Sequence, residues 1–273
     1  MERRNYIFSH PNRVFVRENC IYLKKQEDDL WIKSKGEVVI PVDGLKENQD
    51  PYVFSNPWIY GNSNNKISLT EPICEESTIL FGKYHKDCYS GNYKFLVDNI
   101  FIVDKKYSLD NKSERSIFLD HFVKDYPNFK ENKIYKDFSN KMLNYNKSLN
   151  LILSSKLLNS KSDFINLKDY KYKNLFSFIP LIKDNNNKFS LIDIMPVILK
   201  YNPDHFNNFL KNPKKLYPID SITLKHVIDY VLKNSNTLIT ETESIGAPKK
   251  LDMKLQYEYY KLIYGGLNKA ANI

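Results

Sequence analysis

Alternating hydrophobic and polar positions mark the first hundred residues as β-structure. Residues 12–25 (NRVFVRENCIYLKK) alternate on both sides of a polar break at 18–19, and residues 30–42 (LWIKSKGEVVIPV) alternate on both sides of a break at 34–36. Two alternating runs around a short polar break are typical of a β-hairpin. We therefore expect two hairpins in this region, each turning at its polar break.

Two more runs, residues 77–84 (STILFGKY) and 93–104 (YKFLVDNIFIVD), are rich in the β-branched and aromatic side chains that favour strands. The second run is almost continuously apolar, so we expect a central strand that is buried on both faces. Asp98 and Asn99 interrupt it. A carboxylate buried in a strand is costly unless it is partnered or used. Asp98 therefore either faces solvent or belongs to a functional site.

Helical spacing replaces the alternation after about residue 107. Residues 113–126 (SERSIFLDHFVKDY) carry their apolar side chains on one helical face. Residues 218–236 (PIDSITLKHVIDYVLKNSN) give the strongest helix prediction, with Asp220 or Ser221 as the N-cap. The other expected elements are one or two helices within residues 135–158, a strand at 174–182, an ambiguous stretch at 190–201 and a terminal helix at 252–266.

These patterns predict an α+β fold. A β-rich N-terminal part, residues 1–106, is expected to pack against a basic, mainly helical C-terminal part, residues 107–273. The two parts form either separate units or one compact unit. The chain has 273 residues, 42% of them hydrophobic, which is enough for a sizeable core in either arrangement.

Cysteine usage and hydropathy predict a cytoplasmic protein. The cysteines Cys20, Cys74 and Cys88 are widely spaced and show no zinc-binding pattern, as expected for reduced thiols. The sequence has no run of about 18 apolar residues that would predict a membrane span. The N-terminus lacks the apolar stretch of a secretory signal. We therefore expect no membrane partner.

Positive charge is concentrated in the second part of the chain. Residues 1–110 carry 15 Lys and Arg against 16 Asp and Glu, whereas residues 111–273 carry 26 against 16. A one-sided excess favours a polyanionic partner, DNA or RNA. An AT-rich genome, which raises Lys, Asn, Tyr and Ile together, is the alternative explanation. The candidates for contacts with the DNA backbone are His10, Arg13, Arg17 and Arg115.

Missing motifs argue against several enzyme classes. The chain has no glycine-rich phosphate loop, no H-E-x-x-H zinc motif and no G-x-S-x-G nucleophile elbow. We therefore predict neither a metal ion nor an organic cofactor. Asp98 with Asp104 and Lys105 weakly matches the carboxylate cluster of a metal-dependent nuclease, which stays an alternative.

Residues 48–65 (NQDPYVFSNPWIYGNSNN) combine a carboxylate, amides and large aromatic side chains in a turn-rich segment. Within it, residues 49–52 (QDPY) resemble the G-Q-D-P-Y-H water-activating motif of the uracil-DNA glycosylase family, although Asn and Val replace the outer Gly and His. The resemblance implies that Asp50 activates water, that Tyr52 shapes the base pocket and that Asn99 hydrogen-bonds a flipped base. The family's H-P-S-P loop is matched only at residues 10–11, at the opposite end of the chain.

The residue types also suit base flipping on physical grounds. A carboxylate beside the anomeric carbon stabilises an oxocarbenium-like transition state, and flipped bases are held by aromatic stacking and amides. The candidate catalytic residues are Asp50, Asp98 and Asp120. The candidate base-binding residues are Tyr52, Phe54, Asn56, Trp58, Tyr60, Asn62 and Asn99. Each of them has an ordinary role as a turn, surface or packing residue as the alternative.

The N-terminal part also resembles the PUA-like readers of modified bases found in phage-defence loci. This resemblance lies in the general composition of its strand segments and not in a diagnostic motif. This resemblance implies that the partner is phage DNA carrying modified bases. We therefore predict an antiviral DNA glycosylase that excises a modified base, such as glucosylated hydroxymethylcytosine, and leaves an abasic site. The alternatives are a non-catalytic module that reads modified bases or RNA, a metal-dependent nuclease, and an interaction protein.

Overall fold

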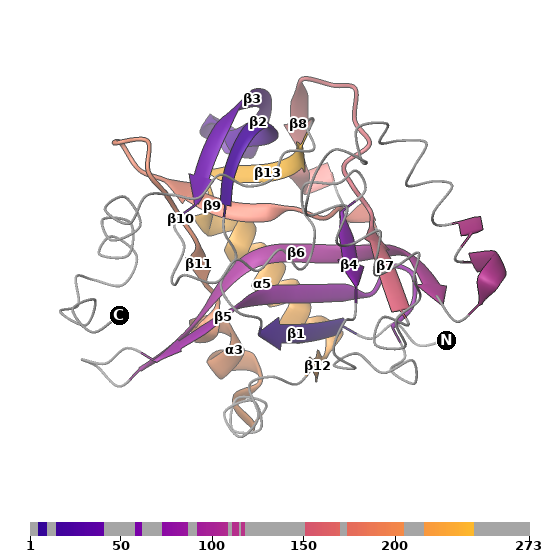
Figure 1. Cartoon of the computed structure of the whole chain (residues 1–273). Helices are drawn as coiled ribbons and strands as arrows, with labels where there is room; N and C mark the ends of the chain where they lie inside the picture. The colour runs from indigo at the N-terminus through magenta and orange to yellow at the C-terminus, as the bar shows by residue number, and fades with distance from the viewer. Residues whose placement is uncertain are drawn as a thin grey trace, which may run out of the picture.

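Two β-sheets with helices packed against them form the described part of the computed structural model (Figure 1). The described residues are 5–9, 15–40, 58–61, 73–86, 92–108, 111–114, 116–117, 151–169, 174–204 and 216–242. Most of them lie in strands, in the second half of the chain as well as in the first. The predicted α+β fold, with a basic and mainly helical C-terminal part, is therefore wrong.

Each sheet takes strands from both halves of the chain. The order in the seven-stranded sheet is β12 (Leu216–Ile219), β1 (Asn5–Ser9), β5 (Thr78–Lys86), β6 (Tyr93–Ser108), β7 (Leu151–Ser155) and β4 (Ile59–Gly61), with β11 (Ile192–Asp193) paired to β6. The order in the six-stranded sheet is β10 (Phe189–Ser190), β9 (Ile179–Lys183), β13 (Thr237–Thr242), β2 (Phe15–Lys25), β3 (Leu30–Ile40) and β8 (Phe164–Asn166). The β1–β5 ladder is parallel, and the other ladders between these strands are antiparallel.

Strand β6 joins the two sheets. One of its edges pairs with β5, and the other edge is shared in turn by β11, by Phe178 and by β7. The backbone N–H of Ile100 donates to the carbonyl of Phe178 at 2.9 Å, and the N–H of Phe178 donates back at 3.0 Å. Because Phe178 directly precedes β9, this bridge connects the seven-stranded sheet to the six-stranded one.

Both faces of the β5–β6 pair are covered by apolar side chains, as predicted for a central strand. The helix-side core lies against α5 (Ser221–Asn234) and α3 (Met195–Tyr201), and Figure 1 shows α5 running behind the strands. This core includes Leu80, Val97, Ile100, Leu224 and Val227. The aromatic core occupies the opposite face of β5 and β6 and includes Phe8, Trp58, Tyr60, Phe81 and Phe101.

The two hairpins predicted in residues 12–42 are wrong, because these residues form one longer hairpin. β2 and β3 are each continuous, and the residues predicted as turns lie within them. At the first polar break, the pairing between β2 and β3 shifts between Arg17 and Cys20, so the break is a β-bulge and not a turn. The chain reverses instead at the 3-10 turn η1 (Glu27–Asp29), where Asp28 and Asp29 adopt left-handed backbone angles with φ of 62° and 60°.

The second half departs from its predicted helices in two places. Residues 151–155 (LILSS), expected to be helical, form β7 between β6 and β4. Strand β13 follows α5 and pairs with β2 and β9, although no element was predicted there. Both strands depend on partners that lie far away in the sequence. The rest of residues 135–158 up to 150, and the expected terminal helix at 252–266, lie outside the described residues.

The strand and helix predictions with the clearest local patterns are confirmed. β5 overlaps its predicted strand almost completely, β9 overlaps only the last four residues of the strand predicted at 174–182, and α5 begins directly after Asp220. The ambiguous stretch at 190–201 divides into β11 and α3. Within the described ranges, no helix is both long and apolar enough to cross a membrane.

Candidate functional site

A β-bulge places two adjacent polar side chains on one face of β6. Phe81 of β5 pairs with Asn99, and the next residue, Gly82, pairs with Val97, so Asp98 is the extra residue of the bulge. Val97 and Ile100 both face the helix-side core. The two residues between them therefore lie towards the aromatic core. Without the bulge, strand alternation would send Asp98 and Asn99 to opposite faces.

Asn99 is the more deeply buried of the two polar residues in this bulge. Its side chain is 0% exposed. Neither its amide nitrogen nor its amide oxygen has a hydrogen-bond partner in the described part of the chain. A buried amide that stays without a hydrogen bond lowers the stability of the fold by about 1–3 kcal/mol. The presence of Asn99 at this position therefore calls for an explanation other than stability. Asp98 beside it is 3% exposed and not solvent-facing, which corrects the alternative that Asp98 faces water.

Aromatic rings surround this face. The ring centroids of Tyr60 and Phe81 are 4.9 Å apart, and Phe81 also lies 5.9 Å from Phe101 and 5.7 Å from Phe8. Trp58, just before β4, is fully buried in the same core. Its indole Nε1 has no acceptor among the described residues. The structure thus brings three predicted base-binding residues, Trp58, Tyr60 and Asn99, to one face of the sheet.

Lys83 is a residue that sequence reasoning missed. It lies on β5 two residues after Phe81, and Tyr84 after it packs against the helix-side core. Alternation therefore places Lys83 on the same face as the bulge. Burial lowers the pKa of Lys83 to about 8. A lysine whose pKa is lowered in this way can release its proton near neutral pH, and groups of this kind are concentrated at functional sites.

The other predicted site residues cannot be placed with this group. Those outside the described residues are Asp50, Tyr52, Phe54, Asn56, Asn62, Asp120, His10, Arg13 and Arg115. Arg17 belongs to β2, but its side chain is not among those described. Asp104, part of the nuclease alternative, lies six residues beyond Asp98 on β6. At about 3.3 Å per residue this separation is roughly 20 Å, too far for one metal ion to bridge.

A second feature, a groove, borders the helix-side core. It has a volume of about 690 Å³ and lies between the β2–β3 turn, η3 (Leu167–Asp169) and α5. Its charged lining is Lys25, Asp29, Lys168, Lys225, Asp229 and Lys233. Its apolar lining is Trp31, Leu167, Leu175, Ile228 and Leu232. Within the described residues, groups of three or more His, Cys, Asp or Glu that could hold a metal ion are absent from the groove and elsewhere.

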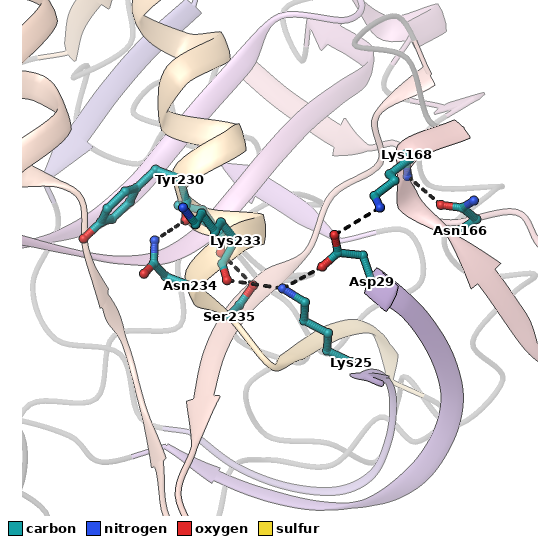
Figure 2. Close-up of polar contacts among 9 residues, drawn as sticks. Lys25, Asp29, Asn166, Lys168, Tyr230, Lys233, Asn234 and Ser235 are labelled. Carbon is teal, nitrogen blue, oxygen red and sulfur yellow. Dashed lines mark hydrogen bonds and ion pairs between the residues drawn. The ribbon is translucent and has the colours of Figure 1, made fainter. Parts of the chain in front are cut away.

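Lys25 organises the polar side of the groove (Figure 2). Its ammonium contacts Asp29 Oδ1 at 3.0 Å and donates to the carbonyl of Lys233 at 3.3 Å. It also lies 5.9 Å from the centre of the Trp31 ring. Asp29 Oδ2 is 3.3 Å from Lys168 Nζ. The Asp29 carboxylate therefore sits between two ammonium groups, and its hydrogen bond with Lys25 and then that with Lys168 hold its pKa below the ordinary value.

The groove could not be predicted from the sequence because it is assembled from three distant segments. Lys225, Asp229 and Lys233 recur at four-residue spacing on α5, a pattern typical of an ordinary solvated helix face. Only the fold brings η1 and η3 against this face. No protein family model matches the chain, and no curated protein or solved structure shows significant similarity to it.

Proposed function

We propose that the protein is a DNA glycosylase that takes a modified base against the aromatic core and cleaves its glycosidic bond. The observation that carries the proposal is the buried Asn99 amide, whose two polar atoms have no hydrogen-bond partner among the described residues. An amide supplies one acceptor and two donors, which suits the polar edge of a nucleobase. Amides among aromatic rings are the arrangement with which base-flipping proteins hold an extruded base.

Asp98 and Lys83 give this face a means of catalysis. When the bond between C1′ and the base nitrogen breaks, positive charge develops on the sugar, and a carboxylate such as Asp98 stabilises it. Water then adds its oxygen to C1′, and the base leaves with a proton. Lys83 in its ammonium form is the general acid for that leaving base. The reaction needs no redox partner, because a water molecule is divided between the two products.

The proposed substrate class, DNA with modified bases, rests on the two sequence resemblances. Phage DNA containing glucosylated hydroxymethylcytosine is the first substrate to test. Because the face around Asn99 is fully buried, a base reaches it only if the covering side chains move apart.

An abasic-site assay tests the proposal. The protein is incubated in EDTA with unmodified, uracil-containing and glucosylated phage DNA, and abasic sites are cleaved with hot alkali. We expect alkali-dependent breaks on one modified substrate and on no other. Asp98→Asn and Asn99→Ala should each lower the rate by about 100-fold or more, because a transition-state charge or a base contact is lost. Asp104→Asn, an exposed carboxylate change on the same strand, is the matched control and should keep full activity.

The pH profile adds a second readout. Lys83 has a pKa of about 8, so the excision rate should fall as the pH rises past that value and the ammonium is lost. Lys83→Gln should remove this decrease of the rate at alkaline pH.

DNA that is bound on gels but never cleaved would reject the excision chemistry and leave a base reader. Breaks that appear only when EDTA is left out would instead indicate the nuclease alternative.

A further inference from the structure

The lysine-lined groove has the size of a small-molecule site and is separate from the Asp98–Asn99 bulge. Its volume of about 690 Å³ falls in the range of about 300–1,000 Å³ typical of ligand pockets. Its floor residues Trp31, Leu167 and Ile228 belong to the helix-side core, whereas the bulge faces the aromatic core. The groove and the bulge therefore lie on opposite faces of the sheet structure.

The charges of the groove favour an anionic ligand. Four lysines and two aspartates line it, so the lining carries a net positive charge. Lys25 and Lys168 converge on one point, because both contact the same Asp29 carboxylate, at 3.0 Å and 3.3 Å. A phosphate group with two negative charges would neutralise both ammonium groups where the single Asp29 charge neutralises only one.

The Asp29 carboxylate lies where the anionic group of a ligand would lie, between Lys25 and Lys168. Its backbone is left-handed, with φ of 60°, and so is that of Asp28 before it, at 62°. Left-handed conformations are unfavourable for most non-glycine residues, although Asp tolerates them better than most. This turn carries the carboxylate to the two lysines, and the side chain of Asp29 is 47% exposed there. An incoming anion can therefore displace it without opening the core.

The floor of the groove favours a ligand with an apolar or flat body. Leu167, Leu175 and Leu232 line it beside Trp31, directly next to the charged rim. An inorganic ion would leave this surface exposed, whereas a nucleoside covers it. We propose that the groove binds a phosphorylated nucleoside, with its phosphate between Lys25 and Lys168 and its body over the apolar floor. Free nucleotide and the 5′-phosphorylated end of a nucleic-acid strand share this chemistry.

Equilibrium dialysis of the full chain tests this site with adenosine 5′-monophosphate, adenosine, inorganic phosphate and a 5′-phosphorylated oligonucleotide. We expect saturable binding of the monophosphate, at least about tenfold tighter than either of its parts, because linked contacts reinforce each other. Comparison with the oligonucleotide separates free nucleotide from a strand end. Adenosine that binds as tightly as its monophosphate would overturn the phosphate assignment, and so would the absence of saturation with every probe.

Three variants sharpen the test. Lys168→Gln should weaken binding about two- to fivefold, as expected for an exposed ion pair, whereas Lys105→Gln, an exposed lysine on β6, should change nothing. Asp29→Asn should strengthen binding, because the competing carboxylate is removed. If Asp29 served only to position the lysines, this variant would weaken binding as Lys168→Gln does, and the proposal that a ligand anion takes the place of Asp29 would be rejected.

The two tryptophans of the chain separate this site from the proposed glycosylase site. Trp58→Phe leaves Trp31 as the only tryptophan, so its fluorescence reports on the groove. The monophosphate should change the Trp31 signal in this variant and leave the Trp58 signal of Trp31→Phe unaltered. A response of Trp58 alone would place the ligand at the aromatic core and overturn the groove proposal. The dialysis on the unaltered chain stays decisive if either variant folds poorly.

Discussion

At the scale of single residues, Gly82 allows the strands to approach closely beside the bulge. A Cβ atom added there would lie 2.5 Å from the carbonyl oxygen of Leu96 and 2.5 Å from Cε1 of Phe95. Glycine inside a strand weakens it through backbone entropy, so its presence calls for a packing reason. The Phe95 ring supplies that reason, because it packs over the position that any other side chain would fill.

Gly82→Ala should lower the free energy of unfolding by about 2–3 kcal/mol, the usual cost of overpacking a core. Urea unfolding followed by circular dichroism measures the change. Gly36→Ala is the matched control, since its Cβ would meet only Tyr22 at 3.5 Å, an ordinary contact. Equal effects of the two substitutions would show that loss of glycine entropy, and not the approach of Phe95, determines the outcome.

At the residue scale, the sequence singled out a polar pair in β6 but did not predict the bulge there. Asp98 and Asn99 stand out as polar residues in an apolar strand. Simple alternation predicts that they point to opposite faces. Their common face depends on the register with β5, in which one residue is skipped, and such a shift leaves no mark in the local pattern.

At the scale of secondary-structure elements, α5 shows how far local rules reach. Asp220 Oδ1 accepts from the backbone N–H of Thr223 at 2.8 Å, and its other oxygen accepts from the Thr223 hydroxyl at 2.6 Å. Of the two N-caps left open by the sequence, the structure thus selects Asp220. Burial raises the pKa of Asp220, but the hydrogen bonds from Thr223 outweigh burial and leave the pKa below its ordinary value.

Asp220→Ala should destabilise the protein by about 1 kcal/mol, the typical cost of a lost N-cap. Ser221→Ala, one residue later and exposed, should be neutral.

Asp220→Asn should keep most of the cap but lose the charge. Because the folded pKa of Asp220 is lowered, the advantage of wild type over Asp220→Asn is fully present above the unfolded pKa of about 3.9. It disappears as the pH falls through the folded value, and thermal unfolding between pH 2 and pH 7 checks this sign. A constant difference across that range would contradict the role of the charge.

The β2–β3 hairpin shows where local rules stop. The polar breaks at 18–19 and 34–36 have the composition of turns, yet both lie within strands. Ser34, Lys35 and Gly36 pair with β2, at Tyr22, Ile21 and Cys20, and those residues of β2 pair on their other side with β13. A polar residue on the edge or face of a strand looks the same in sequence as one in a turn, and only its hydrogen-bond partner distinguishes the two.

At the scale of the whole molecule, β6 and α5 make the two sheets interdependent. The Ile100–Phe178 bridge joins the sheets through their backbones. The helix-side core contains Leu80 from one sheet, Leu23 and Trp31 from the other, and Leu224 from α5. Loss of either sheet would expose the apolar surface of the other, and this coupling favours all-or-none unfolding.

We expect the two sheets to unfold in one transition. Trp31 lies on β3 in the six-stranded sheet, and Trp58 immediately precedes β4 in the seven-stranded sheet. The single-tryptophan variants Trp31→Phe and Trp58→Phe therefore each report on one sheet. In each variant, the urea midpoint from fluorescence should equal the midpoint from circular dichroism. A fluorescence transition displaced from that of circular dichroism in either variant would show that the sheets are separate folding units.

The sequence by itself determined the elements whose patterns are complete within a short window. β5, β6, β9 and α5 were predictable because β-branched side chains, an apolar stripe or a capping aspartate identify them locally. The tertiary structure decided the rest: the strand identity of residues 151–155, the bulge that aligns Asp98 with Asn99, and the groove built from η1, η3 and α5. The physical reason is that local periodicity specifies which side of an element is apolar, whereas partner and register are chosen by contacts between residues far apart in the chain.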